Sequence, residues 1–293
     1  MNQQQSICSQ AREKTRAKRA ATQVFSFLTL RAAAFVNCAA LVIACVFLFV
    51  NGIGALNIDF VLDSPREMMT SGGVFPCLVG TFLLAAGAIA IALPFGVACA
   101  VWLNEYGKQG PVVDIVRLSV ANLAGVPSIV FGLFGLAFFV TALGFNVSLH
   151  SGILTLAVLT LPVIINTTEE ALKQVPRSWR DASLALGATK SQTIGRIVLP
   201  SALPGILTGA ILAVARAAGE TSAVMFTAAV FYTPKLPESV WSSVMALPYH
   251  MYVLATAGTE IEKTRPMQYG TGLLLIVLVF AMNLIAILIR DKM

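Results

Sequence analysis

Charged residues are scarce in this sequence, and their scarcity excludes an ordinary soluble domain. Only 12% of the 293 residues are Asp, Glu, Lys or Arg, whereas about a quarter of the residues are charged in a typical soluble domain. Hydrophobic residues make up 57% of the chain, and the mean hydropathy is +0.81. This composition predicts an all-α integral membrane protein.

The patterns that hold metals, build disulfide frameworks or bind nucleotides are also missing. The five cysteines show no paired metal spacing, and His150 and His250 are isolated, so we interpret them as ordinary loop or interface residues. The P-loop pattern does not occur, because the one Gly-Lys pair is followed by Gln109. We therefore expect no metal, no cofactor and no ATPase site in this chain, which is not expected to be an enzyme.

Six apolar runs are long enough to cross a hydrocarbon core about 30 Å thick. They lie near residues 32–50, 74–103, 118–143, 152–168, 201–228 and 270–289. The first run is expected to be a retained anchor. A further segment, 236–258, contains Glu238, Pro248 and His250, and we expect it to be external or re-entrant.

The basic residues indicate how the chain is oriented. With the N-terminus inside, the inner segments hold most of the 20 Lys and Arg residues. The outer loops hold only Arg66, Lys235, Lys263 and Arg265. We expect a multi-pass protein of the cell inner (plasma) membrane with both termini in the cytoplasm. The net charge of +6 then reflects orientation, and nucleic acid is not an expected partner.

The N-terminal segment is polar and basic. Residues 1–24 show no apolar periodicity that could build a core, so we expect a flexible cytoplasmic tail over residues 1–31. The alternative is that its basic side chains lie on anionic lipid.

Proline and glycine recur inside the predicted spans. Pro94, Pro127 and Pro162 each fall within one, with glycines nearby. Such residues let helices kink and approach one another closely. Packing alone would explain them, and hinges in a protein that changes shape are the alternative.

The most informative inner loop is 169–200, EEALKQVPRSWRDASLALGATKSQTIGRIVLP. Its spacing resembles the EAA loop of ABC importer permeases: Glu-Ala-Ala, three residues, Gly, nine residues, Ile, any residue, Leu-Pro. Asp181 stands in place of the Glu and Ser183 in place of the second Ala. The resemblance implies the type I ABC importer permease architecture and coupling to a separate ATPase. The implied coupling residues are Asp181, Ala182, Ser183, Gly187, Ile197, Leu199 and Pro200.

The stretch DASLALG in this loop suits a short helix. Asp181 favours the positive N-terminal end of a helix, and Gly187 favours the left-handed conformation that ends one. Such a helix can insert into another protein, and the alternative is an interfacial helix that binds only lipid headgroups. The match through Leu199 and Pro200 favours docking, because a generic amphipathic helix does not require it.

A second unusual stretch is ARAAGETSAVMFTA at 215–228, which places Arg216 and Glu220 four positions apart in the fifth apolar run. We expect Arg216 roughly 22 Å along this span, where a charge costs on the order of 2.5–3.5 kcal/mol and faces a bundle interior or a water-filled path. The pair can neutralise itself and lock helix packing. The alternative is a substrate path, because Thr221 and Ser222 add hydroxyls and a guanidinium suits oxyanions such as phosphate.

This stretch, with ANLAGVPSIVFGL at 121–133, is similar to the PstA family of phosphate-specific ABC importer permeases over most of 74–285. The resemblance implies a passive subunit that translocates inorganic phosphate into the cytoplasm. The implied path residues are Arg216, Glu220, Thr221 and Ser222. The implied partners, besides membrane lipid, are a PstC-like second permease subunit, a PstB-like ATPase dimer and a periplasmic or extracellular PstS-like phosphate-binding protein.

The implied organisation is a cytoplasmic tail at 1–31, a transmembrane anchor at 32–50 and an ABC permease domain at 74–290. Two alternatives for the function stay open. The loop identifies the class better than the cargo, so a permease for another oxyanion or small solute is one alternative. A non-ABC ion channel or secondary transporter is the other.

Overall fold

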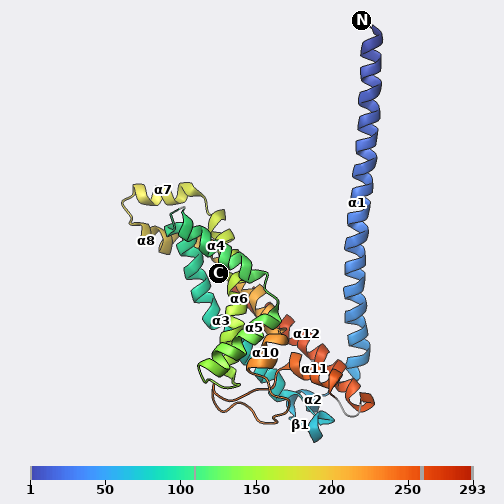
Figure 1. The fold of residues 1–293 in the computed structure, drawn as a ribbon, viewed down its shortest axis with the longest axis vertical. Helices are drawn as coiled ribbons and strands as arrows, with labels where there is room; N and C mark the ends of the chain where they lie inside the picture. Colours follow the sequence, from blue (N-terminus) through green and yellow to red (C-terminus); the bar gives the residue numbers. More distant parts are fainter. Residues whose placement is uncertain (1, 109, 258–260, 292–293) are drawn as a thin grey trace. The chain divides into compact units, whose positions relative to one another are not determined.

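The computed structural model describes residues 2–108, 110–257 and 261–291 and is almost entirely helical there (Figure 1). The chain divides into two compact units, with the boundary between Val50 and Asn51. The first unit consists of nearly all of one helix, and the second contains the remaining elements.

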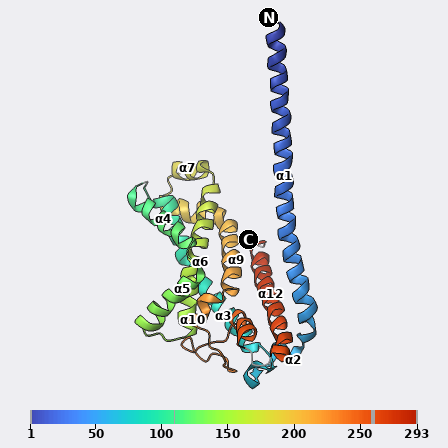
Figure 2. The same ribbon diagram turned by 45° about the vertical axis from the view of Figure 1, so that its right-hand side comes forward.

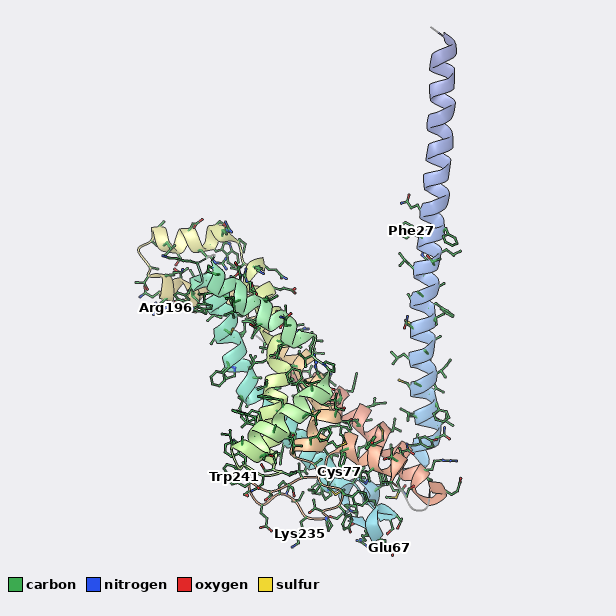
Figure 3. The ribbon with its side chains drawn as sticks, viewed as in Figure 1. Phe27, Glu67, Cys77, Arg196, Lys235 and Trp241 are labelled. Carbon is green, nitrogen blue, oxygen red and sulfur yellow. The ribbon has the colours of Figure 1, made fainter. Side chains whose placement is uncertain are left out.

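The first unit is formed by helix α1 (Asn2–Gly52). The flexible tail expected over residues 1–31 is therefore helical from Asn2 onward. Its sequence explains the difference, because good helix formers such as Gln, Ala, Arg and Lys fill it and no glycine or proline occurs before Gly52. The apolar part spans Phe25–Ala55 and exposes its large side chains, such as Phe27 (Figure 3).

The second unit is built around four long helices that are apolar enough to cross a membrane. Helix α6 packs against both α3 and α9, and α9 also packs against α12 (Figure 2). Helix α3 continues into the π-helical turn η3, and the π-helical turn η5 leads directly into α9. The bounds are α3 (Phe75–Val101), η3 (Trp102–Tyr106), α6 (Leu149–Gln174), η5 (Ile194–Val198), α9 (Leu199–Ala218) and α12 (Ile261–Asp291).

The span predicted at 118–143 is broken. Helix α4 (Pro111–Ala124) and helix α5 (Ser128–Gly135), which continues in the π-helical turn η4 (Leu136–Ala142), meet at an angle of 103°. Pro127 occupies the N-cap of α5 with an extended ψ of 141°. Proline pushes the residue before it away from the helical region, so α4 cannot run on into α5.

The span predicted at 201–228 is also wrong as one helix. Helix α9 ends at Ala218, and a separate short helix, α10 (Ser222–Thr227), follows. Gly219 caps the end of α9, a position where glycine is common because it disfavours continuation of the helix. The break falls inside the stretch that holds the predicted path residues.

The second unit has two distinct ends. The loop end carries α7 (Arg177–Ala185) and α8 (Lys190–Thr193), and Arg196 lies there in Figure 3. The opposite, far end carries Glu67, Lys235 and Trp241 in the same view. Its regular elements are η1 (Ile53–Ala55), α2 (Ile58–Leu62), η2 (Glu67–Met69), the antiparallel pair β1 (Pro65–Arg66) and β2 (Ser71–Gly72), and α11 (Leu247–Thr256).

The described part of segment 236–258, which ends at residue 257, lies at the far end and does not form a span of its own, in accord with the sequence. Its helix α11 packs against α12, and the Leu247 amide donates to Thr81 Oγ1 of α3 at 2.8 Å. His250 is buried with 1% of its surface exposed, and its Nδ1 lies 3.4 Å from Thr271 Oγ1. This histidine is therefore a packing residue between α11 and α12.

Candidate functional site

Arg216 lies in the last turn of α9, about 25 Å along the helix axis from Leu199 at 1.5 Å per residue. Its side chain is exposed and makes no ion pair or hydrogen bond with the described part of the chain. The positive charge is favourable at this end of α9, where the helix dipole is negative. The guanidinium is nevertheless free to bind a group from outside this chain.

The other predicted path residues lie in the break after α9. Glu220 is half-buried between the two helices, Thr221 is the N-cap residue of α10, and Ser222 is its first residue. The hydroxyls of Thr221 and Ser222 make no hydrogen bond with the residues that the structure describes. All four predicted path residues are therefore brought to one junction.

The expected ion pair between Arg216 and Glu220 does not form in the described structure, where no nitrogen of Arg216 comes within 4.0 Å of a Glu220 carboxylate oxygen. The spacing of four places two residues on one face only while the helix continues. Because α9 ends at Ala218, Glu220 follows a different backbone direction. The pair consequently does not lock helix packing within this chain.

A close contact with α5 fixes the position of α10. A Cβ atom on Gly132 would lie 2.8 Å from the Ser222 carbonyl oxygen and 3.0 Å from the Ala223 Cα. Only glycine permits two backbones to approach so closely. The glycine in ANLAGVPSIVFGL thus sets the start of α10 beside α5.

The predicted coupling helix is α7, and its C-terminal end is as expected. Gly187 has a φ of +85°. Its amide donates to the Leu184 carbonyl at 3.0 Å, and the Ala188 amide donates to the Ser183 carbonyl at 3.2 Å. These two bonds form a Schellman motif, in which glycine is strongly preferred.

The expectation for the start of α7 is wrong. The helix begins at Arg177 after Pro176, so Asp181 is in its middle and no acidic residue lies in the first turn. Proline is pre-organised for a helix start and fixes the boundary four residues earlier than expected. Asp181 is exposed on α7 and available to a partner.

The surface of α7 carries exposed large apolar side chains. Trp179 has 51% of its surface exposed, Leu184 46% and Leu186 90%. Clustered apolar side chains on a polar loop mark an interaction surface. Asp181 and Ala182 are exposed between them. The remaining predicted coupling residues lie in η5 (Ile197) and at the start of α9 (Leu199 and Pro200).

Ser183, which departs from the EAA pattern, has a structural role. It is buried, and its Oγ lies 2.9 Å from Oγ1 of Thr193 in α8. A buried hydroxyl needs a partner. The two hydroxyls satisfy each other and fasten α7 to α8.

A third cluster, at the N-terminal half of α7, was not predicted from the sequence. Arg180 donates to both carboxylate oxygens of Glu105 in η3, at 2.7 Å and 3.3 Å. The same guanidinium donates to the carbonyls of Leu172, at 3.0 Å, and Val175, at 2.7 Å, at the end of α6. The partners are 75 residues apart, so no local spacing could reveal them.

A second ionic group lies nearby on α6. Glu169 accepts from Arg117 of α4 at 2.8 Å and pairs with Lys173 at 2.9 Å. Its own side chain is only 10% exposed, whereas both cations are about half exposed. The spacing of Glu169 and Lys173 is readable from the sequence as an i, i+4 pair, but the contact with Arg117 is not.

Comparison with known proteins agrees with this architecture. Residues 92–293 match the family described as the binding-protein-dependent transport system inner membrane component. The chain belongs to this family. Its members are permeases of ABC importers, and the chain is accordingly a multi-pass membrane protein with the type I ABC importer permease fold.

Individual permeases show the same relationship. The probable ABC transporter permease protein YqgI of Bacillus subtilis is 32% identical over 85% of this chain and 90% of its own length. The phosphate transport system permease protein PstA 1 of Mycobacterium tuberculosis is 40% identical over 75% of this chain and 71% of its own. Among solved structures, the MetNI methionine ABC transporter in an inward-facing conformation aligns with a TM-score of 0.58 at 23% identity, covering 75% of this chain and 94% of that one.

Proposed function

We propose that this permease translocates inorganic phosphate into the cytoplasm. The observation that carries the proposal is the exposed Arg216 guanidinium on a membrane-spanning helix. Exposure of such a charge to lipid would cost on the order of 2.5–3.5 kcal/mol. The face of α9 that carries Arg216 is therefore expected to border a second permease subunit and a water-filled path between the two.

The chemistry of the junction suits phosphate. Arg216 offers a planar fork of donors that fits a tetrahedral oxyanion, and Thr221 and Ser222 offer unpaired hydroxyls beside it. Glu220 repels a bound anion and so favours its release. Its carboxylate also accepts a hydrogen bond from the protonated oxygen of phosphate at neutral pH. The 40% identity to a permease named for phosphate transport supports the same cargo.

Energy for transport comes from a separate, PstB-like ATPase dimer in this proposal. The exposed apolar side chains of α7 form its docking surface. In this proposal the loop end and both termini lie in the cytoplasm. A PstS-like binding protein delivers phosphate to the far end, and a PstC-like subunit completes the path. The chain itself performs no covalent chemistry, and its compartment is the cell inner (plasma) membrane.

Cargo is tested with the chain and its co-purified subunits reconstituted in proteoliposomes with ATP inside. We expect radiolabelled phosphate to accumulate in the lumen of vesicles whose binding protein is presented on the opposite side from the ATP. An excess of unlabelled sulfate or molybdate should leave the uptake unchanged. Both ions lack the protonated oxygen that Glu220 accepts from, so they lose this hydrogen bond.

The controls separate the rival functions. Unlabelled phosphate must compete with the label, and a non-hydrolysable ATP analogue must abolish accumulation. Strong inhibition by sulfate or molybdate would assign the permease to another oxyanion. Accumulation that follows an imposed ion gradient without ATP would instead indicate a secondary transporter.

A further inference from the structure

The guanidinium of Arg180 joins three helices at the root of α7. It belongs to α7, it donates to the carboxylate of Glu105 on η3, and it donates to two carbonyls at the end of α6. The ion pair is mostly buried, with side chains 17% and 8% exposed. A pair shielded from water and salt in this way keeps its geometry better than a surface pair.

Helices α7 and α8 are joined to each other by side-chain contacts and are here called the α7–α8 arm. The Ser183–Thr193 hydrogen bond ties α7 to α8, and a capping box at Thr189 and Gln192 fixes the start of α8. Lys190 of α8 lies over the ring of Tyr106, 5.0 Å from its centroid. Both α7 and α8 thus contact the same π-helical turn, η3, through adjacent residues.

The turn η3 is the end of α3, which runs the length of the bundle beside α6. The amide of Gly107, the residue after η3, donates an i to i−5 hydrogen bond to the Trp102 carbonyl at 2.6 Å. Single π-helical turns frequently occur at functional positions in helices. The turn η3 gives the arm its side-chain contacts with the end of α3, whereas α6 and α9 are joined to the arm by the backbone itself.

We propose that Arg180 is a positioning residue that transmits movement of the α7–α8 arm to α3 through Glu105. The inference rests on the proposed function, because it takes the moving force to be the ATPase dimer docked on α7. While the Arg180–Glu105 ion pair is intact, α3, α6 and α9 move together when the arm moves. When the ion pair is lost, the arm rotates about the connection at residues 175–176 and α3 does not move with it.

The alternative is that the ion pair only keeps α7 folded. A purely local role would lower ATPase binding and ATP hydrolysis together and leave the number of phosphate ions imported per ATP unchanged. A transmission role predicts the opposite pattern, with ATP hydrolysis retained and import per ATP reduced. The ratio of the two rates therefore distinguishes the two roles.

The test uses the full complex in proteoliposomes, with ATP hydrolysis and phosphate uptake measured on the same preparation. Glu105→Gln keeps the size of the side chain and removes the charge that Arg180 holds. We expect phosphate imported per ATP to fall about fivefold or more, the lower range of a coupling free energy between sites. Glu105→Asp retains the charge and should recover part of the ratio.

Glu170→Gln is the matched control, because Glu170 lies at the same end of α6, is exposed and has no ion pair in the described part of the chain. It should keep the wild-type ratio. If Glu105→Gln prevents assembly, Tyr106→Leu is used in its place. The side chain of Tyr106 is 47% exposed, so this variant should assemble. It should also lower the amount of phosphate imported per ATP. A wild-type ratio in an assembled Glu105→Gln complex, or in Tyr106→Leu in its place, would overturn the inference. Absence of phosphate uptake by the wild-type complex would instead overturn the proposed function.

Discussion

Phosphate uptake should fall by about 10- to 100-fold when Arg216 is replaced by alanine, while the permease still assembles with its partners. The magnitude follows from the loss of charge-assisted hydrogen bonds, which contribute roughly 1.5–3 kcal/mol each. Assembly should survive because the side chain makes no ion pair or hydrogen bond with the described part of its own chain. Initial uptake rates in proteoliposomes, normalised to the amount of intact complex, measure the effect.

Leu212→Ala is the control for this experiment. Leu212 lies one turn before Arg216 on α9 and is 53% exposed, so the variant removes a side chain from the same face without changing the charge. It should transport at close to the wild-type rate. Arg216→Lys keeps the charge but loses the planar fork, and an intermediate rate is expected. Wild-type uptake by an assembled Arg216→Ala complex would remove Arg216 from the substrate path.

The outcome also bears on how the break after α9 works. A continuous helix would have paired Arg216 with Glu220 and neutralised the cation. The break at Gly219 separates the two and leaves the guanidinium unpaired within the chain. An unpaired cation at membrane depth is costly unless water or a partner subunit reaches it. The irregular backbone and the exposed charge are both accounted for by the proposed path along this face.

The sequence was sufficient for features set by local chemistry. Apolar runs predicted the helices long enough to cross the membrane, although the runs at 118–143 and 201–228 are each divided, and the left-handed preference of glycine predicted the end of α7 at Gly187. Pro127 stood in the sequence as a possible kink, whereas the break at Gly219 was not predicted. Pro127 accounts for the break between α4 and α5, whereas the contact of Gly132 with α10 joins separate segments of the chain, which no local pattern contains.

Residue spacing predicts the wrong contact where a helix ends within the spacing. Arg216 and Glu220 are four residues apart, which indicated a neutral pair, but the rule holds only within an uninterrupted helix. The ion pair between Glu105 and Arg180 was not predicted from the sequence, for a different reason. Its partners come from separate helices, and their meeting depends on how α3, α6 and α7 pack together.

Replacement of Gly187 by valine should release the ATPase from the permease. The φ of +85° lies in a region that costs an L-residue roughly 1–2 kcal/mol, with a β-branched side chain at the unfavourable extreme. A Cβ atom at Gly187 would meet no other atom within 4 Å, so the substitution acts through the backbone alone. It should undo the Schellman motif and displace Leu184 and Leu186 from the docking surface.

Co-purification of the ATPase with the tagged permease measures this effect, and we expect a fall of about 5- to 30-fold, the equivalent of that conformational cost. Gly187→Asn should retain most of the binding, because asparagine tolerates the left-handed conformation. Gly195→Val is the matched control: Gly195 also has open space around its Cβ position but does not have a positive φ. If Gly187→Val co-purifies the ATPase as well as Gly187→Asn does, the partner does not recognise the geometry of the α7 C-terminus. Contact with lipid headgroups then becomes the better explanation of this helix.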